Sequence, residues 1–258
     1  MALGEETSLR PPQPWLIRWE IFAVFAVSLG ASALFAVLRL IAALVARRSL
    51  AGQQALLVGS LAPNHWLDLA LQFADVAVTL APVVLVLYLM ARSGEPPALI
   101  GLDASEPGRD LARGAVVAAV IGGAGLALYL TAFHLGLSLT VVPEALPAVW
   151  WRIPVLLLNA AQNGLLEEIL VVGYLLLRLD QLGWPPAKAI AFSAVLRGSY
   201  HLYQGFGAFI GNAAMGVIFG LLYRRWGRVM PLIVAHTLID AVAFIGYAAL
   251  HGKVSWLP

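Results

Sequence analysis

Long hydrophobic runs, separated by short polar stretches, divide the chain into segments of the length that crosses a membrane. A helix needs roughly 18–20 predominantly apolar residues to span about 30 Å of hydrocarbon. Runs of that length predict seven spans, at about 20–46, 67–91, 113–137, 149–177, 187–204, 207–223 and 229–250. The fourth run is long enough to tilt or break. The predicted fold class is all-α, a polytopic transmembrane helix bundle with any functional site inside the bundle.

Composition agrees with a membrane protein. The 258 residues are 61% hydrophobic and 12% charged, with a mean hydropathy of +0.86, whereas a soluble domain is nearer to half apolar and one quarter charged. The first run is too long for a signal-peptide core and no small-residue cleavage site follows it, so we expect it to remain as a span. The chain has no cysteine, which excludes disulfides, thiol catalysis and cysteine-ligated zinc. The sequence has no basic cluster with interleaved aromatic residues, so it predicts no nucleic acid partner.

Three segments are expected within one integral membrane domain. Residues 1–18 form a short N-terminal tail, of which we expect the first part to be disordered. Residues 19–148 hold the N-terminal transmembrane helices, and residues 149–250 hold the later ones. The sequence contains no repeat of 20–50 residues, which weighs against a transporter built from inverted repeats.

Two features concern packing. The pairs Gly207–Gly211 and Gly216–Gly220 have the small-xxx-small spacing that lets helix backbones approach closely, and we interpret them as packing positions. The loop 92–110 is rich in proline and glycine and is expected to pack at the inner interface.

The distribution of basic residues predicts the orientation. If the N-terminus lies inside, the inner segments hold ten basic residues and the outer segments hold four. The inner set is Arg10, Arg18, Arg92, Arg109, Arg113, Arg178, Lys188, Arg224, Arg225 and Arg228, and the outer set is Arg47, Arg48, Arg152 and Lys253. This bias favours a cytoplasmic N-terminus and an outer C-terminus. We expect a multi-pass protein of a bacterial plasma membrane.

Ionisable residues inside spans are costly and usually mark a functional site. In the fourth span Asn159, Asn163 and Glu167 recur every four residues, which places them on one helix face. Glu168 lies about 100° around the helix from that face. Asn163 and Glu168 are therefore expected to support Glu167, which points with the other polar groups.

The later spans supply further polar residues at helical spacing. Arg197 and His201 share a face of the fifth span, and His236 and Asp240 share a face of the seventh. A carboxylate near two histidines can take a proton from water while an imidazole or a metal stabilises the oxyanion that develops. Two histidines and paired glutamates on separate helices therefore favour a catalytic site over isolated hydrogen bonds.

These residues lie in three short motifs. EEILVVG (167–173), the histidine of RGSYHLYQG (197–205) and HTLID (236–240) resemble the motifs of the CAAX-processing and bacteriocin-processing (CPBP) family. Its members are the Abi or CAAX prenyl protease 2-like intramembrane endopeptidases. The similarity covers roughly residues 150–247, so the resemblance implies that 149–250 are the catalytic helices.

The resemblance implies an endopeptidase that hydrolyses a peptide bond in a membrane-associated or lipidated protein or peptide. Glu167 would activate the water with His201 assisting, and His236 and Asp240 would polarise the scissile carbonyl or hold the oxyanion. Family members are often labelled metalloproteases, so a divalent metal such as zinc is allowed at His201, His236 and Glu167. The sequence has no HExxH motif and does not require the metal.

Two positions depart from the family pattern. The first motif usually has an arginine where this chain has Val172, and the second usually has a phenylalanine where it has Arg197. An arginine lost from one motif helix and gained in another predicts compensation, because a guanidinium beside a buried glutamate lowers the cost of burying it. We expect Arg197 to lie within salt-bridge reach of Glu168, which leaves Glu167 free to act on water.

Two other functions stay open. A non-catalytic membrane scaffold or immunity factor of the same fold is one, and Val172 is its best support. A small-solute or proton-coupled transporter is the other, supported by Asp75 within the second span. We interpret Asp75 instead as the structural partner of a buried arginine such as Arg39.

Overall fold

The computed structural model describes residues 13–254, which form helices joined by short loops and one pair of strands. The first half contains α1 (Pro14–Ala26), α2 (Leu29–Val45), β1 (Gln54–Gly59), α3 (His65–Thr79), α4 (Ala81–Arg92) and α5 (Pro107–His134). The second half contains β2 (Thr140–Ala145), α6 (Arg152–Glu167), a π-helix (Glu168–Tyr174), α7 (Leu175–Gln181), α8 (Pro186–Tyr200), α9 (Phe206–Trp226) and α10 (Met230–Leu250). Single 3₁₀ turns lie at Leu50–Gly52, Pro97–Ile100 and Leu202–Gln204.

The helices confirm a polytopic membrane bundle with fewer full-length spans than the sequence predicts. Within residues 13–254, five helical segments are long and apolar enough to cross a membrane, and α1 with α2, bent by 50° at their junction, make a sixth if they count as one span. The predicted fifth span, 187–204, is a 15-residue helix, α8, followed by a 3₁₀ turn. Polar residues on its buried face shorten its apolar run, and neighbouring helices rather than lipid cover that face.

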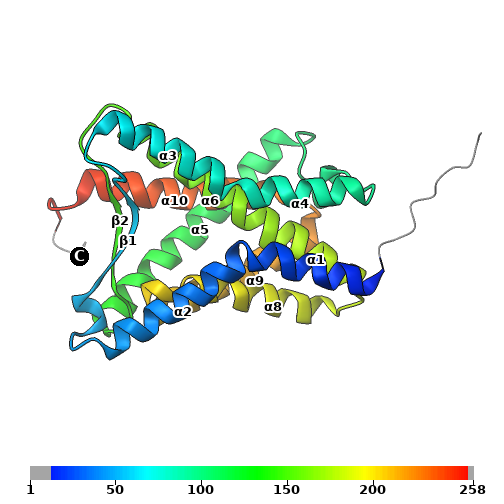
Figure 1. Ribbon diagram of the computed structural model, residues 1–258, viewed down its shortest axis with the longest axis horizontal. Helices are drawn as coiled ribbons and strands as arrows, with labels where there is room; N and C mark the ends of the chain where they lie inside the picture. The colour runs from blue at the N-terminus through cyan, green and yellow to red at the C-terminus, as the bar shows by residue number, and fades with distance from the viewer. Residues whose placement is uncertain (1–12, 255–258) are drawn as a thin grey trace, which may run out of the picture.

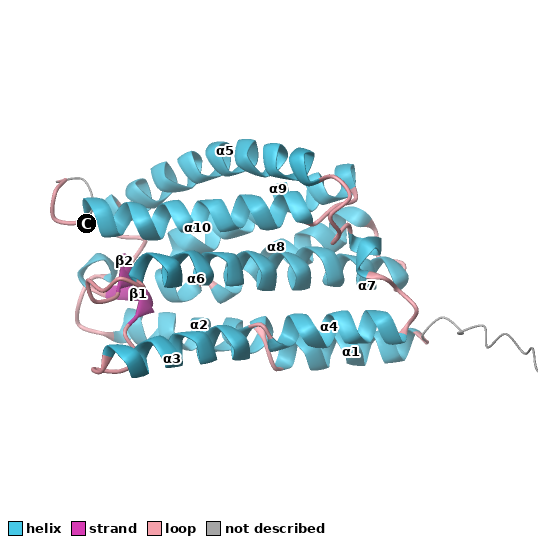
Figure 2. Cartoon of the chain, turned by 90° about the horizontal axis from the view of Figure 1, so that it is seen from above, coloured by secondary structure: helices cyan, strands magenta, loops and turns pink. Residues whose placement is uncertain are grey.

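The helices run roughly side by side along the long axis of the molecule (Figure 1). Figure 2 shows α6 at the centre, between α1–α4 on one side and α5 with α10 on the other. The segment Arg152–Gln181 is accordingly the most enclosed of the candidate spans, with 72% of its most apolar window buried. A polar residue on the buried face of this segment is therefore removed from both lipid and water.

Small residues set the helix contacts, as the glycine spacing predicts. A Cβ on Gly216 would lie 2.9 Å from the Cα of Ala194, and one on Gly220 would lie 3.0 Å from Ile190, so both face α8. Gly207 and Gly211 instead face α5 and the residues that follow it. Side chains at these positions would push the helices apart.

The strand pair is an element that the helical prediction missed. β1 and β2 pair in parallel, with Ala55 opposite Val141, at the end of the bundle where α2 ends and α6 begins (Figure 1). The N-terminal tail also differs from expectation. Helix α1 begins at Pro14, so residues 14–18 are helical, and residues 1–12 of the predicted tail lie outside the described part.

The loop 92–110 packs against the opposite end of the bundle from the strand pair. Ile100 is fully buried, and its carbonyl accepts a hydrogen bond from the Val229 amide at 3.0 Å. Arg228 donates to Asp103 at 3.0 Å and to Asp110 at 2.7 Å. Hydrogen bonds from Ser105, together with the Arg228 guanidinium, lower the pKa of Asp103 to about 2. These contacts fix the loop to the turn between α9 and α10.

Candidate active site

The two adjacent glutamates lie where the backbone of the central helix changes its register. Glu167 is the last residue of α6, and Glu168 is the first residue of the π-helix. Wide turns of this kind inside α-helices occur frequently at functional sites. One turn earlier, Gly164 allows α10 to approach closely, because a Cβ there would lie 2.6 Å from Thr237 Oγ1. This contact brings the glutamates beside His236.

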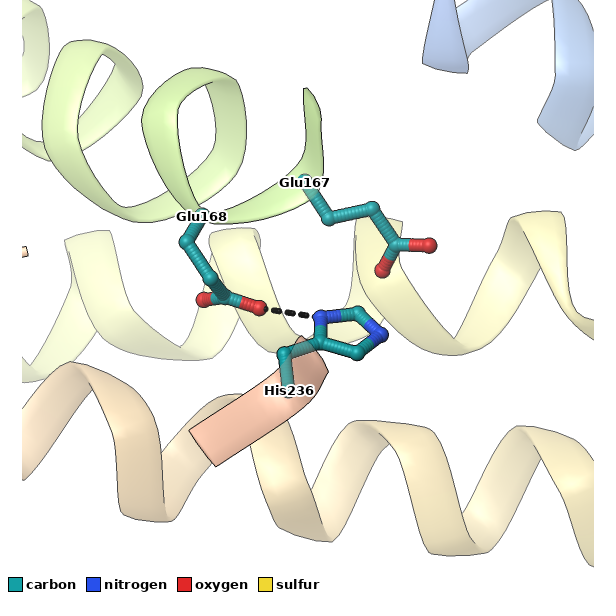
Figure 3. Close-up of side chains that lie close together, drawn as sticks. All are labelled: Glu167, Glu168 and His236. Atoms are coloured by element: carbon teal, nitrogen blue, oxygen red, sulfur yellow. Dashed lines mark hydrogen bonds and ion pairs between the residues drawn. The ribbon is translucent and has the colours of Figure 1, made fainter. Parts of the chain in front are cut away.

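Glu168 is the structural centre of the site. Its Oε1 accepts hydrogen bonds from Arg197 Nη2 at 2.5 Å and from His236 Nδ1 at 2.7 Å (Figure 3 shows the second contact). The Arg197 and Glu168 side chains are both fully buried. The expected ion pair is thus confirmed, and it joins α8, the π-helix and α10. Ser193 strengthens the same contact by donating to the Val171 carbonyl at 2.8 Å.

Glu167 points to a different set of groups. Its Oε2 accepts a hydrogen bond from the Tyr200 hydroxyl at 2.7 Å, and its Oε1 lies 4.0 Å from His201 Nε2. Arg197 Nη2 is also 4.0 Å from Glu167 Oε2, which is too long for a direct hydrogen bond. One oxygen of Glu167 is therefore held by Tyr200, while the other lies beside the His201 imidazole without a direct hydrogen bond to it.

His201 and His236 each have one ring nitrogen fixed by a partner. His201 Nδ1 lies 2.9 Å from the Arg197 carbonyl, which can only accept, so Nδ1 carries the proton and Nε2 faces Glu167. His236 Nδ1 faces the Glu168 carboxylate in the same way. Its Nε2 lies 3.8 Å from Asp240 Oδ2. The Nε2 atoms of both rings therefore point into the space between the carboxylates.

Asp240 is oriented by the polar face of α6. Asn163 Nδ2 donates to Asp240 Oδ2 at 2.8 Å, which places Asn163 in the site as expected. Asn159 lies on the same helix face but bonds to the Val155 carbonyl of its own helix at 3.0 Å. The structure thus brings together Glu167, Glu168, Arg197, His201, His236, Asp240 and Asn163 and leaves Asn159 outside.

The sequence analysis missed Tyr200. Its buried hydroxyl donates a hydrogen bond to Glu167. Its ring contacts the imidazole of His201, the next residue in the chain. The four-residue spacing of Arg197 and His201 drew attention to one face of α8. Tyr200 lies three residues after Arg197, so the i, i+3 neighbour on the same helix surface was the signal that could have identified it.

The expected pairing of Asp75 with Arg39 is wrong. Both residues are exposed on the surface of the bundle, and no ion pair joins them within residues 13–254. Hydropathy does not reveal which helices pack against each other. Arg39 on α2 and Asp75 on α3 do not contact each other. Asp75 is therefore not a deep acid, which removes the main support for a transporter.

The carboxylate side chains fit a divalent metal. Ligand atoms of Glu167, Glu168 and His236 all lie within 4.8 Å of one another. Glu168 Oε2 is buried and accepts no hydrogen bond within the described chain. The site holds three carboxylates, those of Glu167, Glu168 and Asp240, and one guanidinium, that of Arg197. If all three carboxylates are ionised, two negative charges are left to be balanced by protons or a cation. Imidazole and carboxylate suit zinc. This cluster differs in one residue from the ligand set that the sequence analysis allowed, because it contains Glu168 in place of His201.

A comparison with protein families identifies the later helices. Residues 149–242 match the family described as type II CAAX prenyl endopeptidase Rce1-like. The match runs from the start of α6 into α10 and includes every residue of the site. No curated protein and no solved structure matches the chain significantly. Residues 149–242 are therefore similar to the Rce1-like family of type II CAAX prenyl endopeptidases, which confirms the resemblance that the three motifs indicate.

Proposed function

We propose that the protein is an intramembrane endopeptidase in which Glu167 activates a water molecule for attack on a peptide bond. One observation carries this proposal. One oxygen of Glu167 is held by Tyr200, and the other faces His201 Nε2 at 4.0 Å within a buried site. A base and a hydrogen-bond acceptor placed in this way can hold one water between them.

The proton movements follow from the same contacts. Glu167 takes a proton from the water molecule while the oxygen of that water attacks the carbonyl carbon of the peptide bond. His201 Nε2 accepts the other hydrogen of that water, which orients the attacking lone pair. When the tetrahedral intermediate collapses, Glu167 returns its proton to the departing amine. Tyr200 stabilises the charged form of Glu167 before the first step and after the second, when the carboxylate has no proton.

His236 is the group best placed to stabilise the oxyanion. When protonated, its Nε2 donates a hydrogen bond while Glu168 holds Nδ1 and so fixes the ring. Asp240 flanks the same nitrogen and stabilises the imidazolium. An ionised Asp240 would repel an oxyanion, so we assign it to the imidazolium rather than to direct contact with the substrate oxygen.

Glu167, Glu168 and His236 would hold a divalent metal if one binds. Such a metal supplies a Lewis acid that activates water and polarises the carbonyl. Elemental analysis of the purified protein decides its presence. Stoichiometric zinc that is lost from the Glu167→Gln, Glu168→Gln and His236→Gln variants would establish the site.

The substrate class is a membrane-associated or lipidated protein or peptide, cleaved near its C-terminus. This part of the proposal rests on the family match alone. That match covers the proposed catalytic helices, residues 149–242. We place the protein in a bacterial plasma membrane with its N-terminus in the cytoplasm, on the basis of the ten-to-four basic bias.

A non-catalytic scaffold of the same fold predicts a different outcome from the same experiment. Peptides of the membrane fraction are compared by mass spectrometry in cells that carry wild-type protein, Glu167→Ala or Arg225→Ala. The proposal expects uncleaved precursors to accumulate with Glu167→Ala, while the exposed Arg225 serves as the matched control. Identical peptide profiles in all three strains would favour the scaffold.

A further inference from the structure

The segment that contains α2 and the loop after it carries three arginines and no acidic residue. Arg39 lies on α2, and Arg47 and Arg48 follow that helix. No aspartate or glutamate occurs in the sequence between Glu20 and Asp68. All three arginines are exposed, and none forms an ion pair within residues 13–254. This end of the bundle therefore carries a positive charge that no described carboxylate balances directly.

The surroundings of Arg39 are those of a helix that faces lipid. The side chains of Phe35, Leu38 and Leu44 on α2 are each more than half exposed. Arg39 precedes the end of α2 at Val45 by six residues, or about 9 Å along the helix axis. A guanidinium within hydrocarbon is costly unless an anion or several carbonyls contact it, so a long basic side chain near a helix end extends toward the headgroups. Arg39 is therefore placed to reach the level of the lipid phosphates.

Arg39 also lines an open cavity of about 360 Å³ between α2, the start of β1 and the turn that follows α8. This volume is within the range of small-molecule sites. Tyr203 lines the cavity from that turn. Its hydroxyl accepts a hydrogen bond from Gln204 Nε2 at 2.9 Å and keeps its own proton to donate. Gln54 adds a side-chain amide to the lining, and none of the lining residues is acidic. Donors without a carboxylate favour an anion.

The wall of the cavity is fixed by Gln53. Its Nε2 donates to the carbonyl of Ala43 at 2.9 Å and to those of Arg48 and Ser49 at 3.3 Å each. These hydrogen bonds hold the start of β1 beside the last turn of α2. Apolar residues complete the lining, among them Ala42, Leu56 and Leu139. An apolar wall next to a group of donors suits a phosphate ester that carries hydrocarbon better than it suits free phosphate.

We infer that this cavity binds the phosphate of an anionic membrane lipid, with Arg39 as its principal ligand. The planar guanidinium matches two phosphate oxygens in parallel hydrogen bonds, and Arg47 and Arg48 add to the attraction. A lipid with a net negative charge is favoured over phosphatidylcholine, because the choline ammonium would meet three arginines and no acidic side chain. The cavity contains none of the residues assigned to catalysis. The inference is therefore independent of the proposed function.

The test is lipid binding to the purified full-length protein in detergent, measured by native mass spectrometry. The probes are dioctanoyl phosphatidylglycerol and dioctanoyl phosphatidylcholine, and wild type should bind the first about tenfold more tightly. Arg39→Gln should lower the affinity for phosphatidylglycerol by about tenfold to hundredfold, the loss expected for hydrogen bonds to a charged group. Tyr203→Phe, which removes one neutral donor, should lower it by about twofold to tenfold.

Two further variants serve as controls. Arg39→Lys keeps the charge but not the planar pair of donors, so it should lose part of the affinity. Arg225→Gln removes an exposed arginine at the end of α9 and should leave the affinity unchanged. Equal affinities of wild type for the two lipids, or an unchanged affinity for phosphatidylglycerol in Arg39→Gln, would overturn the inference. Glycerol 3-phosphate distinguishes the source of the phosphate: if it displaces the lipid at equal concentration, the assignment to a lipid is wrong.

Discussion

Replacing Arg197 with phenylalanine, the residue usual in the family, should destabilise this protein. Arg197 and Glu168 are both fully buried, and the contact between them, at 2.5 Å, joins Glu168 to the one arginine that bonds to it within residues 13–254. Without the guanidinium, His236 Nδ1 remains as the only donor to Glu168 Oε1 among the described residues. Removing one partner of a buried ion pair costs about 3–5 kcal/mol. At about 2–4 °C per kcal/mol for a chain of this size, the unfolding midpoint should fall by about 6–20 °C.

The assay is tryptophan fluorescence during heating of the protein in detergent at equal concentration. Arg225→Phe removes an exposed arginine and serves as the matched control, with an expected shift of no more than about 2 °C. Arg197→Phe with Glu168→Gln should recover at least half of the loss, because the buried carboxylate is then uncharged. A midpoint of Arg197→Phe equal to that of wild type, or no relief from Glu168→Gln, would refute the reasoning. Arg197→Phe with Val172→Arg should restore peptide cleavage if the arginine has moved between the motifs.

Three further predictions test separate parts of the account. Tyr200→Phe removes the hydrogen bond to Glu167 and should lower kcat by about tenfold to hundredfold with little change in KM, measured on a farnesylated peptide; an unchanged kcat would show that Tyr200 is structural only. Because the pKa of Asp103 is lowered to about 2 in the folded protein, its stabilising contribution is complete above about pH 4 and is lost as the pH falls toward 2. The unfolding midpoint of wild type should therefore fall more steeply over that interval than that of Asp103→Asn, and parallel curves would contradict the assignment. Reporter fusions should place the loop 92–110 in the cytoplasm, and an outer location would invert the proposed topology.

The sequence predicts those features that depend on periodicity along one helix. The spacing of Asn163 and Glu167 correctly places both in the site, and the 100° offset of Glu168 correctly separates its partners from those of Glu167. The contact of Arg197 with Glu168 also follows from one-dimensional reasoning, because a buried guanidinium needs a carboxylate. The glycine pairs identify close helix contacts but not which helices they join.

Other features depend on three-dimensional context and could not be predicted in this way. The π-helix changes the register after Glu167, and a pattern counted at 3.6 residues per turn does not reveal a change of this kind. β1 and β2 are six residues each and lie far apart in the sequence, so their pairing has no local signal. The Asp75–Arg39 hypothesis failed because hydropathy does not specify which helices pack together. Arg39 instead lines a cavity together with residues of β1.

The most direct test of the central claim is peptide cleavage in water enriched in ¹⁸O. Purified wild-type protein and Glu167→Gln are reconstituted in nanodiscs with the farnesylated peptide, and the products are analysed by mass spectrometry. The account predicts that wild type places one ¹⁸O atom in the new C-terminal carboxylate of the product. Glu167→Gln, which keeps an acceptor for Tyr200 but cannot take a proton, should be folded and inactive. A folded Glu167→Gln variant that cleaves at the wild-type rate would contradict the account.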